Sequence, residues 1–175
     1  MQSLKKYEGI SPFDLKENIF DLLDNRWMLI TAGSEQHFNT MTASWGGFGI
    51  LWNKTVSFIF IRPQRYTHKF VESKDTFTLS FFSEKYRSVL NFCGSKSGRD
   101  YNKPKEAGLT PVITPNNSIA FGEASLILDC RKIYSDVIKN DHFIDSSIID
   151  KVYPAKDFHT LYIGEITECY LTDNQ

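Results

Sequence analysis

Short apolar stretches separated by turn residues dominate the hydrophobic pattern along the chain. Residues 27–33 (WMLITAG) and 55–61 (TVSFIFI) are apolar runs that predict strands, and the second run is expected to be buried on both faces. Residues 77–81 (FTLSF) alternate between apolar and hydroxyl side chains, which predicts a strand with one face in the core. Residues 122–137 and 159–171 predict two further extended strands, and the first is long enough to contain a bend.

Helical patterns are few and short. Ser11 and Pro12 suit the N-cap and first turn of a helix that is expected to end near Asn25. The apolar side of this helix would be formed by Phe13, Ile19, Phe20, Leu22 and Leu23. Three more short helices are predicted at residues 67–73, 84–92 and 142–153. Many strands at short spacing with few helices favour a mainly β fold of the barrel type over a doubly wound sheet.

The composition is that of an ordinary globular chain. Its 175 residues fit one domain, residues 1–175, and its 41% hydrophobic and 23% charged residues exclude a disordered protein. The net charge of -1 argues against a protein whose main task is to bind duplex nucleic acid, because such proteins usually carry a basic excess. The longest apolar runs are too short to span a bilayer and no signal-peptide pattern is present, so we expect a cytoplasmic protein without membrane contact.

Several common chemical motifs are missing from the sequence. The cysteines, Cys93, Cys130 and Cys169, form no CxxC pair, and the 4 histidines form no HExxH or HxH pattern, so neither a metal site nor a disulfide framework is indicated. No GxGxxG or GxxxxGK[ST] segment occurs, which argues against a Rossmann nucleotide site and a P-loop. Cys93 has no His–Asp pairing in the sequence, and we interpret it as a packing thiol rather than a nucleophile.

The segment NTMTASWGGFG, residues 39–49, is the first candidate for ligand binding. Thr40, Thr42 and Ser44 occupy alternate positions, so on a strand their hydroxyl groups would point the same way and present several donors to one ligand. The glycines that follow Trp45 would let a flat ligand approach the backbone closely. The alternative, a Thr-rich strand that runs into a loop, stays open on this segment alone.

Two basic segments suit an anion. In IRPQRYTHKF, residues 61–70, cations and a hydroxyl follow a buried strand, and a helix starting near Thr67 would add backbone donors for a phosphate. The polar residues of this segment are Arg62, Arg65, Thr67 and Lys69. CGSKSGRDYNK, residues 93–103, offers Ser95, Lys96, Ser97, Arg99 and Lys103 in a glycine-broken loop that can cradle an anion. Solvated surface loops remain the alternative for both.

The closing segment DFHTLYIGEI, residues 157–166, places His159 close to Asp157 at the start of a strand. A histidine there can act as a general base or contact a ligand, although a lone histidine is more often a structural residue. The same caution applies to His37, His68 and His142.

Taken in order, NxMTxSW with following glycines, RPxRYT, CGxKSGRD and DxHxLYIGEI resemble the flavin reductase-like domain family, and the resemblance runs from Trp27 to Tyr170. It implies a split β-barrel of Greek-key type that binds FMN, with a few short helices. It also implies a homodimer with FMN near the subunit interface.

The resemblance assigns residues to the two ends of FMN. The isoalloxazine ring is expected to be lined by Thr42, Ala43, Ser44 and Trp45, with Asn39, Thr40 and Gly46 beside them. The phosphate and ribityl chain are expected to be reached by Arg62, Tyr66 and Thr67, with Ser97 and Lys103, and Lys96 and Arg99 as options, near the phosphate or closing the site. His142 and His159 carry over less directly, since the motif around His159 can instead shape the dimer and the core.

The function implied is an oxidoreductase in which NADH or NADPH reduces FMN. The alternative is a flavoredoxin-like electron carrier that holds FMN, has no nicotinamide site of its own and works with a redox partner protein. A haem-binding module is disfavoured because no histidine occupies an obvious axial position. The choice between NADH and NADPH, the final electron acceptor, the mode of FMN retention and the roles of Cys93 and His159 stay open.

Overall fold

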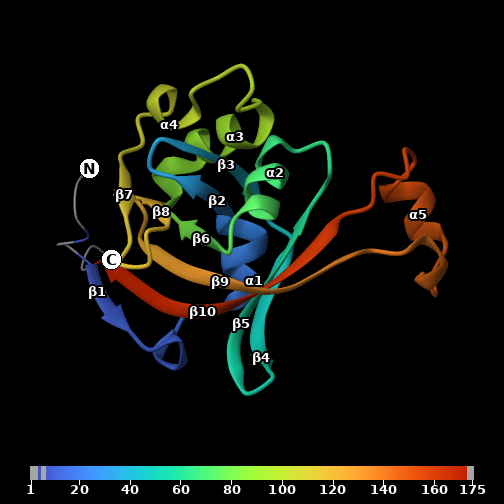
Figure 1. The fold of residues 1–175 in the computed structure, drawn as a ribbon, viewed down its shortest axis with the longest axis horizontal. Helices are drawn as coiled ribbons and strands as arrows, with labels where there is room; N and C mark the ends of the chain where they lie inside the picture. The colour runs from blue at the N-terminus through green and yellow to red at the C-terminus, as the bar shows by residue number, and fades with distance from the viewer. Residues whose placement is uncertain (1–3, 5–6, 173–175) are drawn as a thin grey trace.

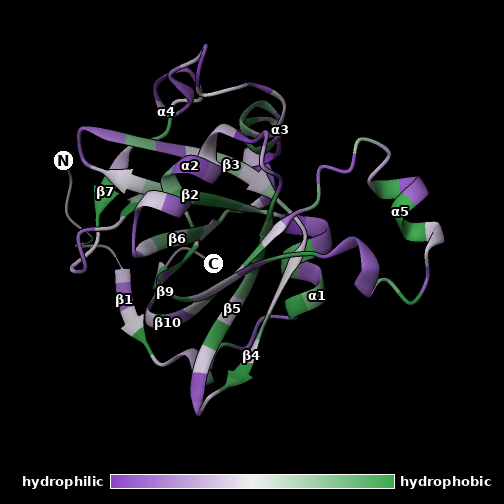
Figure 2. Cartoon of the chain, turned by 45° about the vertical axis from the view of Figure 1, so that its right-hand side comes forward, coloured by the Kyte–Doolittle hydropathy of each residue, from purple (hydrophilic) through white to green (hydrophobic). Residues whose placement is uncertain are grey.

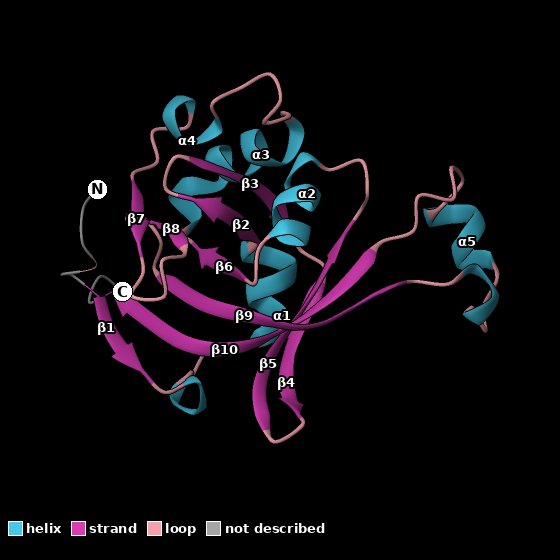
Figure 3. Cartoon of the chain, viewed as in Figure 1, coloured by secondary structure: helices cyan, strands magenta, loops and turns pink. Residues whose placement is uncertain are grey.

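The computed structural model describes residue 4 and residues 7–172, and a large antiparallel sheet forms most of it (Figures 1 and 3). The strands of this sheet are β1 (Tyr7–Ile10), β2 (Met28–Ser34), β3 (His37–Ala43), β4 (Gly46–Leu51), β5 (Lys54–Ile61), β6 (Thr76–Phe81), β9 (Leu126–Val137) and β10 (Thr160–Thr172). Their order is β3-β2-β6-β9-β10-β5-β4, and β1 pairs with β10. A separate hairpin is formed by β7 (Pro111–Ile113) and β8 (Ile119–Phe121).

Short helices lie between the strands and cover parts of the sheet (Figure 3). The α-helices are α1 (Ile19–Asp21), α2 (Tyr66–Ser73), α3 (Arg87–Ser95), α4 (Lys103–Glu106) and α5 (Ser147–Val152). Three 3₁₀ turns cover Pro12–Asp14, Glu84–Tyr86 and Asn140–His142, and a π turn covers Leu22–Arg26. The fold class predicted from the sequence, mainly β with a few short helices, is confirmed.

Three antiparallel hairpins, β2–β3, β4–β5 and β9–β10, give the sheet its order. The β4–β5 turn places Trp52 and Asn53 at φ values of 51° and 57°, the left-handed geometry that joins two strands through two residues. After β5 the chain passes through α2 and returns as β6 between β2 and β9, a connection of the Greek-key kind.

The strands expected at residues 77–81 and 55–61 exist, but their burial differs from the sequence pattern. In β6 the hydroxyl face is buried as well, since Thr78 and Ser80 are both inaccessible and Thr78 Oγ1 donates to the carbonyl of Ile119 in the β7–β8 hairpin. The prediction of a one-faced strand is therefore wrong, because this hairpin covers the second face. In β5, Phe58 and Phe60 are only half-buried, so the prediction of burial on both faces is also wrong.

The helix expected from Ser11 to Asn25 is broken into separate turns. Ser11 caps the first turn, as predicted, but Asn18 starts a second one by accepting hydrogen bonds from the backbone of Phe20 and Asp21. Two apolar residues assigned to the buried side are exposed instead, Phe13 by 77% and Phe20 by 82%. Because the cap at Asn18 begins a new helical turn, residues 11–25 do not form one continuous helix with a single apolar side.

Residues 138–158, called here the arm, project from the rest of the molecule between β9 and β10 (Figure 1). The helix predicted at residues 142–153 is present as α5, at residues Ser147–Val152. This helix carries both hydrophobic and hydrophilic residues (Figure 2), and Ile144 beside it is fully exposed. The base of the arm is closed by a backbone hydrogen bond of 3.0 Å from Ile138 N to the carbonyl of His159.

Candidate functional site

A cavity of about 540 Å³ opens where the end of β3, the end of β5, α3 and the start of β10 meet. Its wall is formed by Trp27, Met41, Thr42, Ala43, Ser44, Trp45, Phe60, Arg62, Arg65, Leu90, Asn91, Gly94, Ser95 and His159. The volume lies in the range of small-molecule and cofactor sites, and apolar rings share the wall with two guanidinium groups. The cavity therefore suits a flat molecule with an anionic end.

The junction of β3 and α3 forms one side of the cavity. Thr42 Oγ1 donates to the carbonyl of Leu90, which fixes the end of β3 against the helix. Gly94 allows this approach, because a Cβ atom at this position would lie 3.3 Å from the Cβ of Thr42. Ala43, Ser44 and Trp45 continue the wall beyond the hydrogen bond, and Trp45 is 51% exposed at the edge of the cavity.

Arg65 supplies an unpaired cation to the cavity. It is the N-cap residue of α2, and its Nη2 atom is buried without a hydrogen-bond partner in the described part of the chain. Burial lowers the pKa of the Arg65 guanidinium below its ordinary value, a sign that the charge is poorly solvated. A buried donor without a partner is costly, and Arg65 lines the cavity, where an anion would be attracted to its guanidinium.

Arg62 also lines the cavity, but its charge is already paired. Its guanidinium donates to the Asp157 carboxylate and, at 2.9 Å, to the carbonyl of Val152, and it lies 5.1 Å from the centre of the Tyr153 ring. The hydrogen bonds from Arg62 and Gln64 hold the pKa of Asp157 below its usual value. Arg62 thus joins the cavity wall to the arm.

His159 lies at the base of the arm and is 7% exposed. Its Nδ1 atom shares a 2.8 Å hydrogen bond with the hydroxyl of Tyr153, and its ring centre lies 5.2 Å from that of Trp45. Burial, helped by the nearby Arg62 cation, lowers the pKa of His159 to about 4, while Asp157 opposes this shift. The imidazole is therefore neutral near pH 7.

Four of the predicted contact residues are buried and do not line this cavity: Asn39, Thr40, Thr67 and Lys103. Asn39 Nδ2 donates to Thr67 Oγ1 at 2.8 Å, and the hydroxyls of Thr40 and Thr31 share a 2.9 Å hydrogen bond. The Lys103 ammonium, only 3% exposed, donates to the carbonyls of Thr40 and Cys93. Burial lowers the pKa of Lys103 to about 8, and these contacts join β3, α3 and α4 in one packed unit.

A second, smaller pocket of about 360 Å³ lies between α2, the β2–β3 turn and the loop before α4. It contains Asn39, Tyr66, Arg99 and Lys103 from the predicted set. The Tyr66 ring is already covered by cations, with Lys69 Nζ at 4.0 Å and the guanidinium carbon of Arg99 at 4.8 Å from its centre. The aromatic face of Tyr66 is therefore already used by contacts within the chain.

The remaining predicted residues line neither pocket. Gly46 begins β4 beside the cavity, and a Cβ atom there would lie 2.6 Å from the carbonyl oxygen of Phe58. Lys96 is exposed and Ser97 half-buried in the loop after α3, and His142 is exposed on the arm. The structure thus brings Thr42, Ala43, Ser44, Trp45 and Arg62 together with His159, and leaves Lys96 and His142 apart from them.

Sequence reasoning did not place Trp27 or Asn91 in the site, and it named Arg65 only as one of several cations that suit a phosphate. Arg65 belongs to the RPxRYT segment, so its motif was a usable signal. Trp27 has a φ of 63°, rare for a bulky residue, and its Nε1 donates to the carbonyl of Asp24, which turns the chain into β2 beside the cavity. Only the folded backbone reveals this geometry.

Neither a reactive thiol nor a metal site is found among the described residues of the cavity. Cys93 is fully buried, and burial raises the pKa of its thiol to about 11, which disfavours the thiolate at neutral pH. Within residues 7–172, no group of three or more His, Cys, Asp or Glu side chains is placed to hold a metal ion. The cavity relies on cations, hydroxyls and aromatic rings.

Residues 21–175 match the family model of the flavin reductase like domain. The chain belongs to the flavin reductase-like family. None of the curated proteins compared with the chain matches its sequence. This family includes FMN flavoproteins, so the flavin-binding character predicted from the four motifs is confirmed at the level of the family.

Solved structures give the same result for the fold. The chain is similar to flavoredoxin of Desulfovibrio vulgaris (Miyazaki F), with a TM-score of 0.66, 21% identity and coverage of 85% of this chain and 70% of that one. For an FMN-binding domain of a flavin reductases-like enzyme from Shewanella baltica OS155, the TM-score is 0.69 and the identity 16%, and the similarity covers 95% of this chain and 77% of that one. For the FMN-binding protein from Thermus thermophilus, the TM-score is 0.66 and the identity 15%, and the similarity covers 94% of this chain and 83% of that one. The fold is the split barrel of FMN-binding proteins, as expected. The strands at the two ends of the sheet order, β3 and β4, do not pair with each other, so strand pairing does not close the sheet.

Proposed function

We propose that this protein binds FMN in the 540 Å³ cavity and is an NAD(P)H-dependent flavin reductase. The observation that carries the proposal is that Arg65, whose Nη2 atom has no partner in the described residues, lines a cavity otherwise walled by rings and by the end of β3. FMN has the matching parts, a phosphate and a flat amphipathic ring. When bound, FMN supplies a ring that accepts a hydride equivalent from reduced nicotinamide.

In this proposal the chain positions the two ends of the cofactor. Arg65 holds the phosphate, and Arg62 reaches it in competition with Asp157. Thr42, Ala43 and Ser44 line the ring, and Trp45 offers a half-exposed aromatic face at the edge of the cavity. Thr67 and Lys103 act indirectly, because their hydrogen bonds hold β3 against α2 and α3.

The reductase is tested by an anaerobic titration of the FMN-loaded protein. Bleaching of the flavin absorption band by NADH or NADPH alone supports the proposal and shows which nucleotide is preferred. A flavin that bleaches only with dithionite or with a reduced partner protein rules the reductase out. That result would favour the electron carrier, for which the similarity to the fold of flavoredoxins is the relevant observation.

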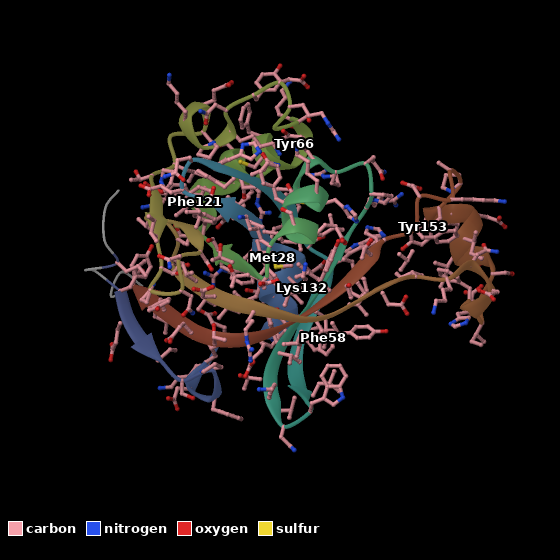
Figure 4. The ribbon with its side chains drawn as sticks, viewed as in Figure 1. Met28, Phe58, Tyr66, Phe121, Lys132 and Tyr153 are labelled. Atoms are coloured by element: carbon pink, nitrogen blue, oxygen red, sulfur yellow. The ribbon has the colours of Figure 1, made fainter. Side chains whose placement is uncertain are left out.

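We also propose that the protein is a homodimer. Phe58 of β5, Ile163 of β10 and Tyr134 of β9 form one row across the sheet, and the exposed Trp52 contacts Tyr134 at a ring distance of 6.2 Å. Tyr134 and Trp52 are exposed by 42% and 57%, Phe58 is half-buried and Ile163 is buried. Exposed aromatic side chains gathered on a sheet face are typical of a protein interface. Figure 4 shows Phe58 beside β5, away from the helices. Light scattering after size exclusion should give twice the chain mass of 20.2 kDa, and Trp52→Ser should shift the equilibrium toward the monomer.

The expected setting is the cytoplasm. The three cysteines are all free and buried, as is usual for proteins of reducing compartments. No helix of the described residues is long and apolar enough to cross a membrane.

A further inference from the structure

Trp27 lines the cavity on a backbone conformation that tryptophan rarely adopts. Its φ and ψ are 63° and 170°, a region that glycine enters readily and that is strained for other residues. Trp27 directly precedes β2, whose first residue, Met28, pairs with Ala43, so Trp27 flanks residues 43–45 of the cavity wall. Strain of this kind persists only where surrounding contacts impose it, and it is commonest at ligand and active sites.

Contacts on two sides fix the indole of Trp27. Its Nε1 atom donates to the carbonyl of Asp24 at 2.9 Å, which satisfies the one polar atom of the ring. The guanidinium carbon of Arg87 lies 4.2 Å from the centre of the indole, and the same guanidinium donates to the carbonyl of Asn25. Arg87 forms no ion pair within the described residues, so its guanidinium is committed to this turn and this ring.

The indole is also packed against the interior of the protein. Trp27 is half-buried and contacts the buried cluster that contains Leu90 and Cys93 of α3, the helix that lies beside β2 and β3 (Figure 1). Trp45, the other tryptophan of the wall, is 51% exposed at the edge of the cavity. A ring that is already immobile loses little conformational entropy when a ligand packs on it, so Trp27 is the preorganised aromatic surface of the site.

We propose that Trp27 binds the isoalloxazine ring of the flavin through its indole, and that Arg87 is a positioning residue that holds the indole for this contact. The inference rests on the proposed binding of FMN in the cavity. Arg87 covers one face of the indole, and the remainder lines the cavity together with Leu90 and Asn91. An aromatic surface recognises the flat ring and not the phosphate, which separates the role of Trp27 from that of Arg65.

Fluorescence titration with riboflavin and with FMN tests the contact. Trp27→Ala removes the ring and keeps the strained backbone, whereas Trp27→Gly removes the ring and relieves the backbone. We expect both variants to raise the dissociation constants of riboflavin and of FMN about tenfold, through the loss of one aromatic contact. Trp27→Gly should also unfold at a higher urea concentration than Trp27→Ala, because glycine adopts this backbone without strain. The glycine variant therefore guards against a loss of binding that reflects misfolding.

The role of Arg87 is tested by a double-mutant cycle with riboflavin. Arg87→Met should weaken binding about threefold when Trp27 is present, through the loss of a cation–π contact, and should have no effect in the Trp27→Ala background. Arg87→Lys keeps a cation over the indole and should retain an affinity close to the native one. Lys85→Met is the matched control, since it removes a cation that lies 5.3 Å from the Tyr86 ring, outside the cavity. An equal effect of Arg87→Met in both backgrounds would show that Arg87 does not act through Trp27.

The outcomes separate this inference from the proposed function. If both Trp27 variants bind riboflavin with native affinity, Trp27 does not contact the ring and the inference is wrong, while FMN binding in the cavity stands. If they weaken FMN and not riboflavin, the indole acts on the phosphate end and the inference is also wrong. If the native protein binds neither flavin, the proposed function fails and the inference fails with it. A protein that binds flavin but is not reduced by NAD(P)H loses the reductase function, and the role of Trp27 is then still decided by the titrations.

Discussion

Replacing Arg65 with methionine tests the charge of the cavity most directly. Methionine keeps much of the length of the side chain but removes the guanidinium, whose Nη2 atom is buried without a partner in the part of the chain that the structure describes. A charge-assisted hydrogen bond contributes roughly 1.5–3 kcal/mol, so the FMN dissociation constant should rise by about tenfold to more than a hundredfold. The free protein should gain stability of the order of 1 kcal/mol, because a poorly solvated charge is removed. Binding and stability should therefore change in opposite directions.

Fluorescence titration with FMN and with riboflavin measures the binding, and urea unfolding without flavin measures the stability. Riboflavin lacks the phosphate, so its affinity should be the same in native protein and in Arg65→Met. Arg99→Met is the matched control, since this exposed arginine stacks on Tyr66 outside the cavity. An FMN dissociation constant within twofold of the native one, or an equal loss of riboflavin binding, would refute the assignment of the phosphate to Arg65.

Three further changes probe the frame of the site. The pKa of Asp157 is lowered by its hydrogen bond with Arg62, so above about pH 4 this ion pair should keep the arm packed against the end of β5. As the pH falls through the folded-state pKa of Asp157, the ion pair should be lost and hydrogen exchange of residues 138–158 should rise. Asp157→Asn should abolish this pH dependence. Gly46→Ala should destabilise the protein by about 1–3 kcal/mol in urea unfolding, because its Cβ would lie 2.6 Å from a carbonyl oxygen, whereas Gly49→Ala, with its closest contact at 3.8 Å, should cost far less. Thr42→Val should cost about 1 kcal/mol of stability and weaken FMN binding, and a native affinity would show that the hydrogen bond to α3 does not shape the cavity.

Local patterns identified most of the long strands and the helices near the site. The apolar run at residues 27–33 forms β2 and the final apolar stretch forms β10. Both were predictable because the residues that favour a strand follow one another directly in the sequence. The glycine-rich start of β4 was not among the predicted strands, since glycine has no strand propensity of its own. Its hydrogen bonds to β5 make it a strand, and Phe58 packs over Gly47 and Gly49 at 3.7 and 3.8 Å from their added Cβ positions.

The sequence by itself determined the family, the fold class and the chemical groups available to the site, because motif order and strand patterns are local properties of the chain. It did not determine which arginine is free. Arg62 and Arg65 are equivalent cations in one short segment, but Asp157 lies 95 residues away from Arg62 and reaches it only when the arm folds back to the end of β5. In the same way, Lys103 became a structural cation because tertiary packing places two carbonyl groups around its ammonium. Long-range pairing decides which charges are neutralised within the protein and which are left for a ligand.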